Sequence, residues 1–300
     1  MRLVISLATR NRADRLLEVV KQDLKCLSVP NTLLMVHVDE DDAGTMAVVP
    51  TLQEMSQVEV TVKPREDTVA AKWNRALSTP ADLYMLAGDD DPIVTPDADA
   101  KILRAYEHFD DGIGFVFGRL CNASFASIHC MSRRVVDHLG YFQPEYFPYW
   151  FCDHWTDDLA RLIGRIETCD VRTDQSNVGR TMEMREPGWW ATWFDATYAW
   201  REREAQSIIE MPEFKASAEE KQRLIRNFQL VRDRSFWINA GVRGMHEQLR
   251  QQRRLGDTTD PRYQRVKQRA IELLDDTISE EYRAVLLPMK IPSPQRAYAY

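Results

Sequence analysis

The sequence predicts an α/β fold in which a mixed, mostly parallel sheet carries helices on both faces and a C-terminal helical extension follows. Two observations support this prediction. The first half alternates short apolar segments with amphipathic ones, as parallel sheets covered by helices require. From about residue 210 the chain becomes charged and shows helical periodicity without strand signals. The 300 residues are 44% hydrophobic and 28% charged, which is typical of globular proteins.

The expected elements of the first half follow from local periodicity. Segments rich in β-branched and apolar residues predict strands, at 2–8, 32–39, 58–63, 82–88 and 113–120. Apolar residues at helical spacing, such as Leu16, Val20 and Leu24, predict helices between the strands, at 12–24, 68–78 and 97–109.

Helix-start signals mark the second half. Ser217 and Glu220 form a capping-box pattern, and Asp260 followed by Pro261 predicts an N-cap with proline at the first helical position. We therefore expect a main domain over 1–209 and a helical extension with a tail over 210–300.

Charge and cysteine content exclude several classes of protein. The net charge of −7 disfavours binding of nucleic acid or membrane by bulk electrostatics. No segment approaches the roughly 18 apolar residues of a membrane span. The N-terminal segment 1–12 is interpreted as a strand rather than a secretory signal. Cysteines 26, 121, 130, 152 and 169 lack CxxC spacing, so we expect reduced thiols, no zinc site and a cytoplasmic location.

The segment "LYMLAGDDDP" (83–92) places three adjacent carboxylates after an apolar strand. Ligands bind at the carboxyl ends of strands in such sheets, and Mg²⁺ and Mn²⁺ prefer oxygen ligands. If the chain stays extended, Asp89 and Asp91 face one ion while Asp90 points elsewhere. The alternative is a solvated acidic turn before Pro92, and these residues alone do not decide between the two.

Four motifs in order resemble the family 2 glycosyltransferases of the GT-A fold. They are "LATRNR" (7–12), "VHVDEDDAG" (36–44), "AAKWNRAL" (70–77) and "MLAGDDD" (85–91). The resemblance covers about residues 2–165. It implies a nucleotide-sugar half over about 1–120 and an acceptor half over about 121–209.

The resemblance also implies roles for individual residues in donor binding. The nucleotide pocket would include Thr9, Arg12, Lys72 and Asn74, with Arg12 and Lys72 close to phosphate. Asp39 would accept hydrogen bonds from the base, and Asp41 is the alternative. Asp39 has a second interpretation, as the cap of a helix after Gly44.

The acidic triplet would bind the metal and the ribose. Asp89 and Asp91 are the expected ligands of Mn²⁺ or Mg²⁺, and Asp90 is an alternative contact. Together with the donor-binding residues, they predict binding of a nucleotide-sugar, with UDP-sugar as the expected donor.

The acceptor half contains the candidate general base. In "YWFCDHWTDDLARLIGRI" (149–166), the resemblance places Asp153 at the acidic position near the acceptor. Asp157 is the alternative, although it also fits the first turn of a helix, where negative charge is favourable. An inverting transfer, which the resemblance implies, requires such a carboxylate to accept the proton of the acceptor hydroxyl.

The segment 186–200 contains Trp189, Trp190, Trp193 and Trp200. An exposed apolar patch of this kind would need a partner. We favour the other interpretation, a buried joint between the main domain and the extension. A homo-oligomer through this segment or through the C-terminal helices is also an expectation.

The predicted function is metal-dependent transfer of a sugar from a nucleotide diphosphate sugar to a hydroxyl group. The acceptor is left open among a glycan, a lipid, a protein and a modified nucleic-acid base. A nucleotidyltransferase is the first alternative, but it predicts a glycine-containing phosphate loop after the first strand, and "LATRNRADR" has no glycine. A non-catalytic GT-A-like binding protein is the second, and it predicts degraded acidic motifs.

Overall fold

A seven-stranded sheet forms the centre of the computed structural model, which describes residues 1–118, 128–148, 150–174, 185–251 and 255–287. The strand order is β3-β2-β1-β4-β6-β5-β7. The strands are β1 (Leu3–Ala8), β2 (Leu33–Asp39), β3 (Val58–Lys63), β4 (Leu83–Gly88), β5 (Phe115–Gly118), β6 (His129–Ser132) and β7 (Ile166–Cys169).

The pairing of the first four strands brings their carboxyl ends to one edge. β1 runs parallel to β2 and β4, with Ala8 opposite both His37 and Gly88. β2 is parallel to β3, with Asp39 opposite Lys63. β6 is antiparallel to β4 and β5, which makes the sheet mixed. The residues that follow β1, β2 and β4 therefore meet, as the sequence predicts.

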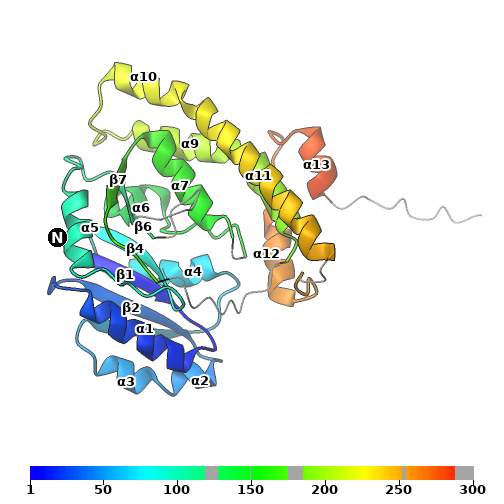
Figure 1. The fold of residues 1–300 in the computed structure, drawn as a ribbon. Coiled ribbons are helices and arrows are strands. Elements are labelled where there is room, and N and C mark those ends of the chain that lie inside the picture. Colours follow the sequence, from blue (N-terminus) through cyan, green and yellow to red (C-terminus); the bar gives the residue numbers. More distant parts are fainter. Residues whose placement is uncertain (119–127, 149, 175–184, 252–254, 288–300) are drawn as a thin grey trace, which may run out of the picture.

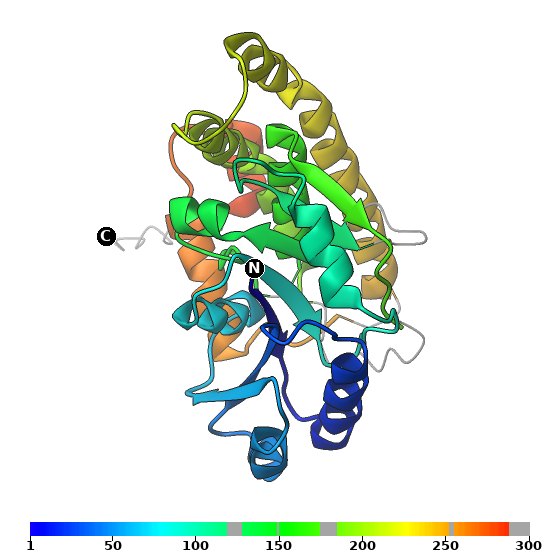
Figure 2. The same ribbon diagram turned by 90° about the vertical axis from the view of Figure 1, so that its left-hand side faces the viewer.

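Helices cover both faces of the sheet (Figures 1 and 2). Side chains alternate along β1, so Leu3, Ile5 and Leu7 pack into one core while Val4 packs into the other. The first core includes residues of α1 (Ala13–Lys25), α3 (Val49–Gln53) and α5 (Ala98–Tyr106). The second includes residues of α6 (Arg133–Leu139), α7 (Cys152–Ile163) and the later helices.

The first-half predictions are confirmed with small shifts of the boundaries. The predicted helix over 68–78 is divided into α4 (Val69–Asn74) and a 3₁₀ turn, η1 (Arg75–Ser78). A short helix, α2 (Ala43–Met46), follows β2. The predicted strand over 113–120 is β5, and residues 119 and 120 lie outside the described ranges.

The second half is helical as predicted. It contains α8 (Pro187–Ala196), α9 (Tyr198–Ile209), α10 (Ala218–Arg226), α11 (Phe228–Gln251), α12 (Pro261–Glu272) and α13 (Glu280–Leu286). The capping box of Ser217 and Glu220 begins α10, and Asp260 caps α12 with Pro261 at its first position. Both predicted helix starts are confirmed.

The tryptophan-rich segment forms the buried joint that the sequence favours. Trp190 and Trp193 are 1% and 0% exposed. Their indole N–H groups donate to the Tyr263 hydroxyl at 3.2 Å and to the Ala270 carbonyl at 2.9 Å, both on α12. One hydrophobic core thus continues from the sheet into the extension.

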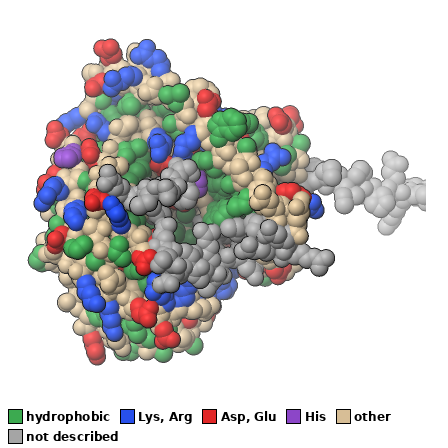
Figure 3. Space-filling view, viewed as in Figure 1, with side chains coloured by type: hydrophobic (Ala, Val, Ile, Leu, Met, Phe, Trp, Pro, Cys, Tyr) green, Lys and Arg blue, Asp and Glu red, His purple; other side chains and the backbone are tan. Residues whose placement is uncertain are grey.

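The surface and the cysteines agree with the composition. Acidic and basic side chains are interspersed over the face shown in Figure 3. None of the described helices is long and apolar enough to cross a bilayer. Four cysteines, at 26, 130, 152 and 169, are free thiols, and Cys121 lies outside the described residues.

Candidate active site

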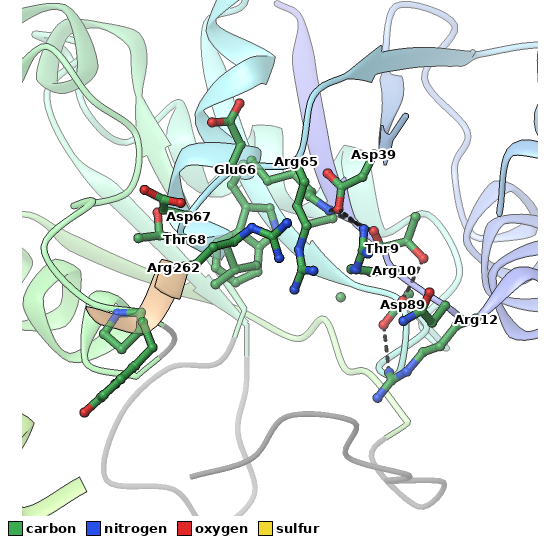
Figure 4. Close-up of a pocket in the computed structure, with 18 of the residues that line it drawn as sticks. Thr9, Arg10, Arg12, Asp39, Arg65, Glu66, Asp67, Thr68, Asp89 and Arg262 are labelled. Atoms are coloured by element: carbon green, nitrogen blue, oxygen red, sulfur yellow. Dashed lines mark hydrogen bonds and ion pairs between the residues drawn. The ribbon is translucent and has the colours of Figure 1, made fainter. Parts of the chain in front are cut away.

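A cavity of about 570 Å³ opens at the carboxyl ends of β1, β2 and β4 (Figure 4). Parallel α/β sheets bind ligands at this position. Residues from the sheet, from the loop after β3 and from the extension line it, including Thr9, Arg10, Arg12, Asp39, Arg65, Lys72, Asp89, Asp90, Arg185 and Arg262. Six of the eleven residues predicted for the site are in this set.

Asp89 and Asp90 form the acidic end of the cavity. Asp89 is 8% exposed and accepts hydrogen bonds from the Thr9 hydroxyl and the Arg12 guanidinium, both at 2.8 Å. The same Arg12 nitrogen lies 3.2 Å from the Asp90 carboxylate. Burial raises the pKa of Asp89, although Thr9 and Arg12 oppose the shift. A positive group between the two carboxylates is therefore strongly favoured.

The alternation predicted for Asp89 and Asp91 is not observed. β4 ends at Gly88 and a turn follows, so the two-residue period of a strand does not continue through the triplet. Asp90 folds back toward the end of β4. A Cβ atom added at Gly88 would lie only 2.9 Å from Oδ1 of Asp90. Asp89 and Asp90 line the cavity, whereas Asp91 lies near Asp23 of α1 and raises the pKa of that carboxyl group.

Asp39 lies in a buried cluster at the other end of the cavity. Its fully buried carboxylate accepts from Lys72 Nζ at 2.6 Å and from Arg10 at 3.0 Å. Arg75 approaches from behind, at 3.4 Å. Burial lowers the pKa of Lys72, and the Asp39 carboxylate opposes the shift. These three cations surround the Asp39 carboxylate and fix it at the wall of the cavity.

The helix-capping interpretation of Asp39 is wrong. Asp42 caps α2 instead, because its carboxylate accepts the Thr45 backbone N–H at 3.1 Å and the Thr45 hydroxyl at 2.6 Å. Asp41 is exposed and does not line the cavity, although it pairs at 2.6 Å with Arg10, which does.

Asn74 does not line the cavity, although the resemblance places it there. Its amide oxygen accepts the backbone N–H groups of Phe142 and Gln143, at 3.1 and 2.8 Å. Its amide nitrogen donates to the Gln143 carbonyl at 2.9 Å and to Glu145 at 2.8 Å. In this geometry Asn74 holds the loop before α7 against α4.

The two candidate bases have different surroundings. Asp153, in the first turn of α7, has a 27% exposed side chain and contacts His154 Nδ1 at 2.9 Å. Asp157 is 1% exposed and pairs with Arg161 and with Arg234 of α11. Neither lines the cavity, but Trp150, three residues before Asp153, does.

Several arginines of the cavity are missing from the sequence-based prediction. Arg10 is adjacent to the predicted Thr9, and Arg65 follows the end of β3, so both positions carry a local signal. Arg185, just before α8, and Arg262, on α12, are far from the sheet edge in sequence and reach the site only through tertiary packing. The sequence offers no comparable signal for them.

The donor set fits a hard divalent cation. Asp89 and Asp90 offer carboxylate oxygens at the rim of a cavity, and Mg²⁺ commonly takes one or two carboxylates with water and phosphate in the remaining positions. Within the described ranges, no group of three or more His, Cys, Asp or Glu side chains is arranged as a metal site. The ion would therefore depend on its nucleotide for further ligands.

Comparison with solved structures identifies the fold. TarS from S. aureus in complex with UDP matches at 12% identity over 76% of this chain and 71% of that one, with a TM-score of 0.52. The mannosyltransferase PcManGT from Pyrobaculum calidifontis, in complex with GDP-Man and Mn²⁺, matches at 15% identity over 95% and 84%, with a TM-score of 0.50. No family model and no curated protein matches the sequence. At such low identity the likeness shows the fold alone, and it confirms the predicted GT-A architecture.

Proposed function

We propose that this protein is a metal-dependent glycosyltransferase that moves a sugar from a nucleotide diphosphate sugar to an acceptor hydroxyl. The observation that carries the proposal is the placement of a paired carboxylate, Asp89 and Asp90, and a buried Asp39–Lys72 pair in one cavity. The ligands of two similar solved structures, UDP in one and GDP-Man with Mn²⁺ in the other, support this choice.

In this proposal Asp89 and Asp90 hold Mn²⁺ or Mg²⁺. The ion would supply positive charge to a diphosphate leaving group. Arg12 already contacts both carboxylates. It would remain beside them when the ion is bound and would be close enough to contact phosphate. Asp91 is not proposed as a ligand, because it lies near Asp23 rather than in the cavity.

The nucleoside would bind toward Asp39. Lys72 donates to both the Asp39 carboxylate and the Thr9 carbonyl, at 2.6 and 3.0 Å, and so fixes the β1 and β2 ends relative to one another. Asp41 and Arg10 at the rim would contact the nucleotide from its exposed side. We propose UDP as the nucleotide.

Asp153 is the proposed general base of an inverting transfer. Burial acts to raise its pKa, but His154 and His129 outweigh that effect and lower the pKa. The carboxylate is therefore ionised at neutral pH and able to accept the proton of the acceptor hydroxyl. Asp157 is not proposed, because Arg161 and Arg234 occupy its buried carboxylate.

A nucleotide screen tests the proposed function. Thermal unfolding is followed with UDP, GDP and CTP, each with and without Mn²⁺, because a ligand that binds the native state raises its apparent stability. We expect UDP to stabilise the protein only when Mn²⁺ is present. A preference for CTP without a sugar-transfer reaction would favour a nucleotidyltransferase, and no response to any nucleotide would favour a non-catalytic protein.

A further inference from the structure

Arg65, which is exposed, and Arg262, which is half-buried, bring two positive charges together at the open side of the cavity. Figure 4 shows their side chains pointing toward one another, with Arg65 on the loop after β3 and Arg262 on α12. Among the residues that the structure describes, neither guanidinium makes a hydrogen bond or an ion pair. Burial is the largest cause that lowers the pKa of Arg65, the charges of Arg10 and Arg262 add to the shift, and Asp41 and Asp39 oppose it.

The acidic residues of the cavity make no ion pair with these two arginines, because each already has another ion-pair partner. The pairs are Asp39 with Lys72, Arg10 and Arg75, Glu66 with Arg75, Asp67 with Arg265, Asp89 and Asp90 with Arg12, and Asp260 with Arg185. Within the described ranges, two guanidinium groups without an ion-pair partner therefore face the cavity, and like charges at short range favour an anion between them.

The extension places Arg262 by specific contacts. Asp260 accepts the backbone N–H of Arg262 at 2.9 Å and thereby fixes the start of α12. One turn later, Arg265 forms two hydrogen bonds with Asp67, beside the lining residue Thr68. Residues three apart share a helix face, so the contact that anchors α12 also directs Arg262 into the cavity.

We propose that Arg65 and Arg262 form a phosphate-binding subsite, so that the C-terminal extension completes the ligand cavity. Guanidinium groups bind phosphate oxygens through paired, charge-assisted hydrogen bonds. A diphosphate esterified at both ends carries two negative charges, which two arginines neutralise. The phosphate comes either from the donor, a choice that rests on the proposed function, or from a phosphate group on the acceptor.

The test measures calorimetric binding of inorganic pyrophosphate without metal, and of UDP and uridine with Mn²⁺. The proteins are wild type, Arg65→Gln, Arg262→Gln and Arg262→Lys. Arg226→Gln is the matched control, because it makes the same charge change at an exposed position of the extension, on α10, outside the cavity. Unfolding by urea checks that each variant remains folded.

We expect each glutamine variant to weaken pyrophosphate binding by at least about tenfold, and the control to leave it unchanged. Arg262→Lys should restore only part of the affinity, because lysine keeps the charge but loses the planar fork. Equal pyrophosphate binding by wild type and both glutamine variants, or no binding by wild type, overturns the subsite.

The nucleotide measurements identify the source of the phosphate. If the subsite holds the donor diphosphate, both glutamine variants bind UDP more weakly than wild type does, and they bind uridine equally well. If it holds an acceptor phosphate, UDP binding is unchanged, and inorganic phosphate binds to the UDP-saturated wild type but not to the variants. If the wild type binds pyrophosphate through these arginines but binds no nucleotide, the proposed function is refuted. The proposal of a phosphate subsite is then still supported.

Discussion

Asp23 of α1 is a buried carboxyl group that supports the loop carrying the acidic triplet, and its replacement by asparagine is expected to change the pH dependence of stability. The side chain accepts the Ile93 backbone N–H at 2.7 Å, just beyond Asp91. Asparagine keeps a carbonyl oxygen for this bond but cannot ionise. The substitution therefore isolates the effect of the charge.

The size of the effect follows from the pKa. Burial raises the pKa of Asp23 from 3.8 to about 7, and the nearby Asp91 adds to the shift. The folded protein then retains a proton that the unfolded chain releases, so the free energy of unfolding falls as the pH rises from about 4 to about 7. For a group that is 1% exposed, this amounts to roughly 2 to 3 kcal/mol between about pH 5 and about pH 8.

Urea unfolding of wild type and Asp23→Asn across this pH range is the assay. We expect the variant to gain stability relative to wild type as the pH rises, because it lacks the buried charge. Asp14→Asn, an exposed substitution in the first turn of α1, should differ from wild type by no more than about 0.5 kcal/mol at every pH. Parallel stability curves for Asp23→Asn and wild type would refute the reasoning.

Three further substitutions separate structural from catalytic roles. Asn74→Ala removes four hydrogen bonds to 142–145, so unfolding should show a loss of about 2 to 4 kcal/mol while the affinity for UDP, measured by calorimetry, stays unchanged. Arg201→Met leaves the buried Asp158 with Arg234 alone and should cost about 3 kcal/mol in urea unfolding; a loss below about 1 kcal/mol would contradict the importance of this pair. Asp153→Asn should keep UDP affinity and reduce turnover by about a hundredfold or more in a sugar-transfer assay, and full turnover would exclude Asp153 as the base.

The sequence predicts the sheet edge well because the relevant signals are local. Strands β1 to β4 are apolar runs between helical segments, and parallel pairing then requires their carboxyl ends to meet. The helix starts at Ser217 and Asp260 are equally local, since capping depends on a few adjacent residues.

Features that depend on tertiary pairing were not predictable in the same way. β6 and β7 have only four residues each, too few for a period to show, and β6 is defined by its antiparallel partners. The sequence correctly predicts that β4 ends at Gly88, but the orientation of Asp89 and Asp90 depends on the turn that follows, which the apolar run does not reveal. Arg262 reaches the cavity through the packing of α12 beside the loop after β3, and nothing near position 262 indicates this contact.

The most direct test of the central claim is the anomalous scattering of manganese in crystals grown with UDP and Mn²⁺. We predict one ion in contact with both Asp89 and Asp90, and UDP in the cavity between Thr9 and Asp39. A nucleotide bound in this cavity with its manganese held elsewhere, or Asp89 and Asp90 still paired only with Arg12 at saturating UDP and Mn²⁺, would contradict it.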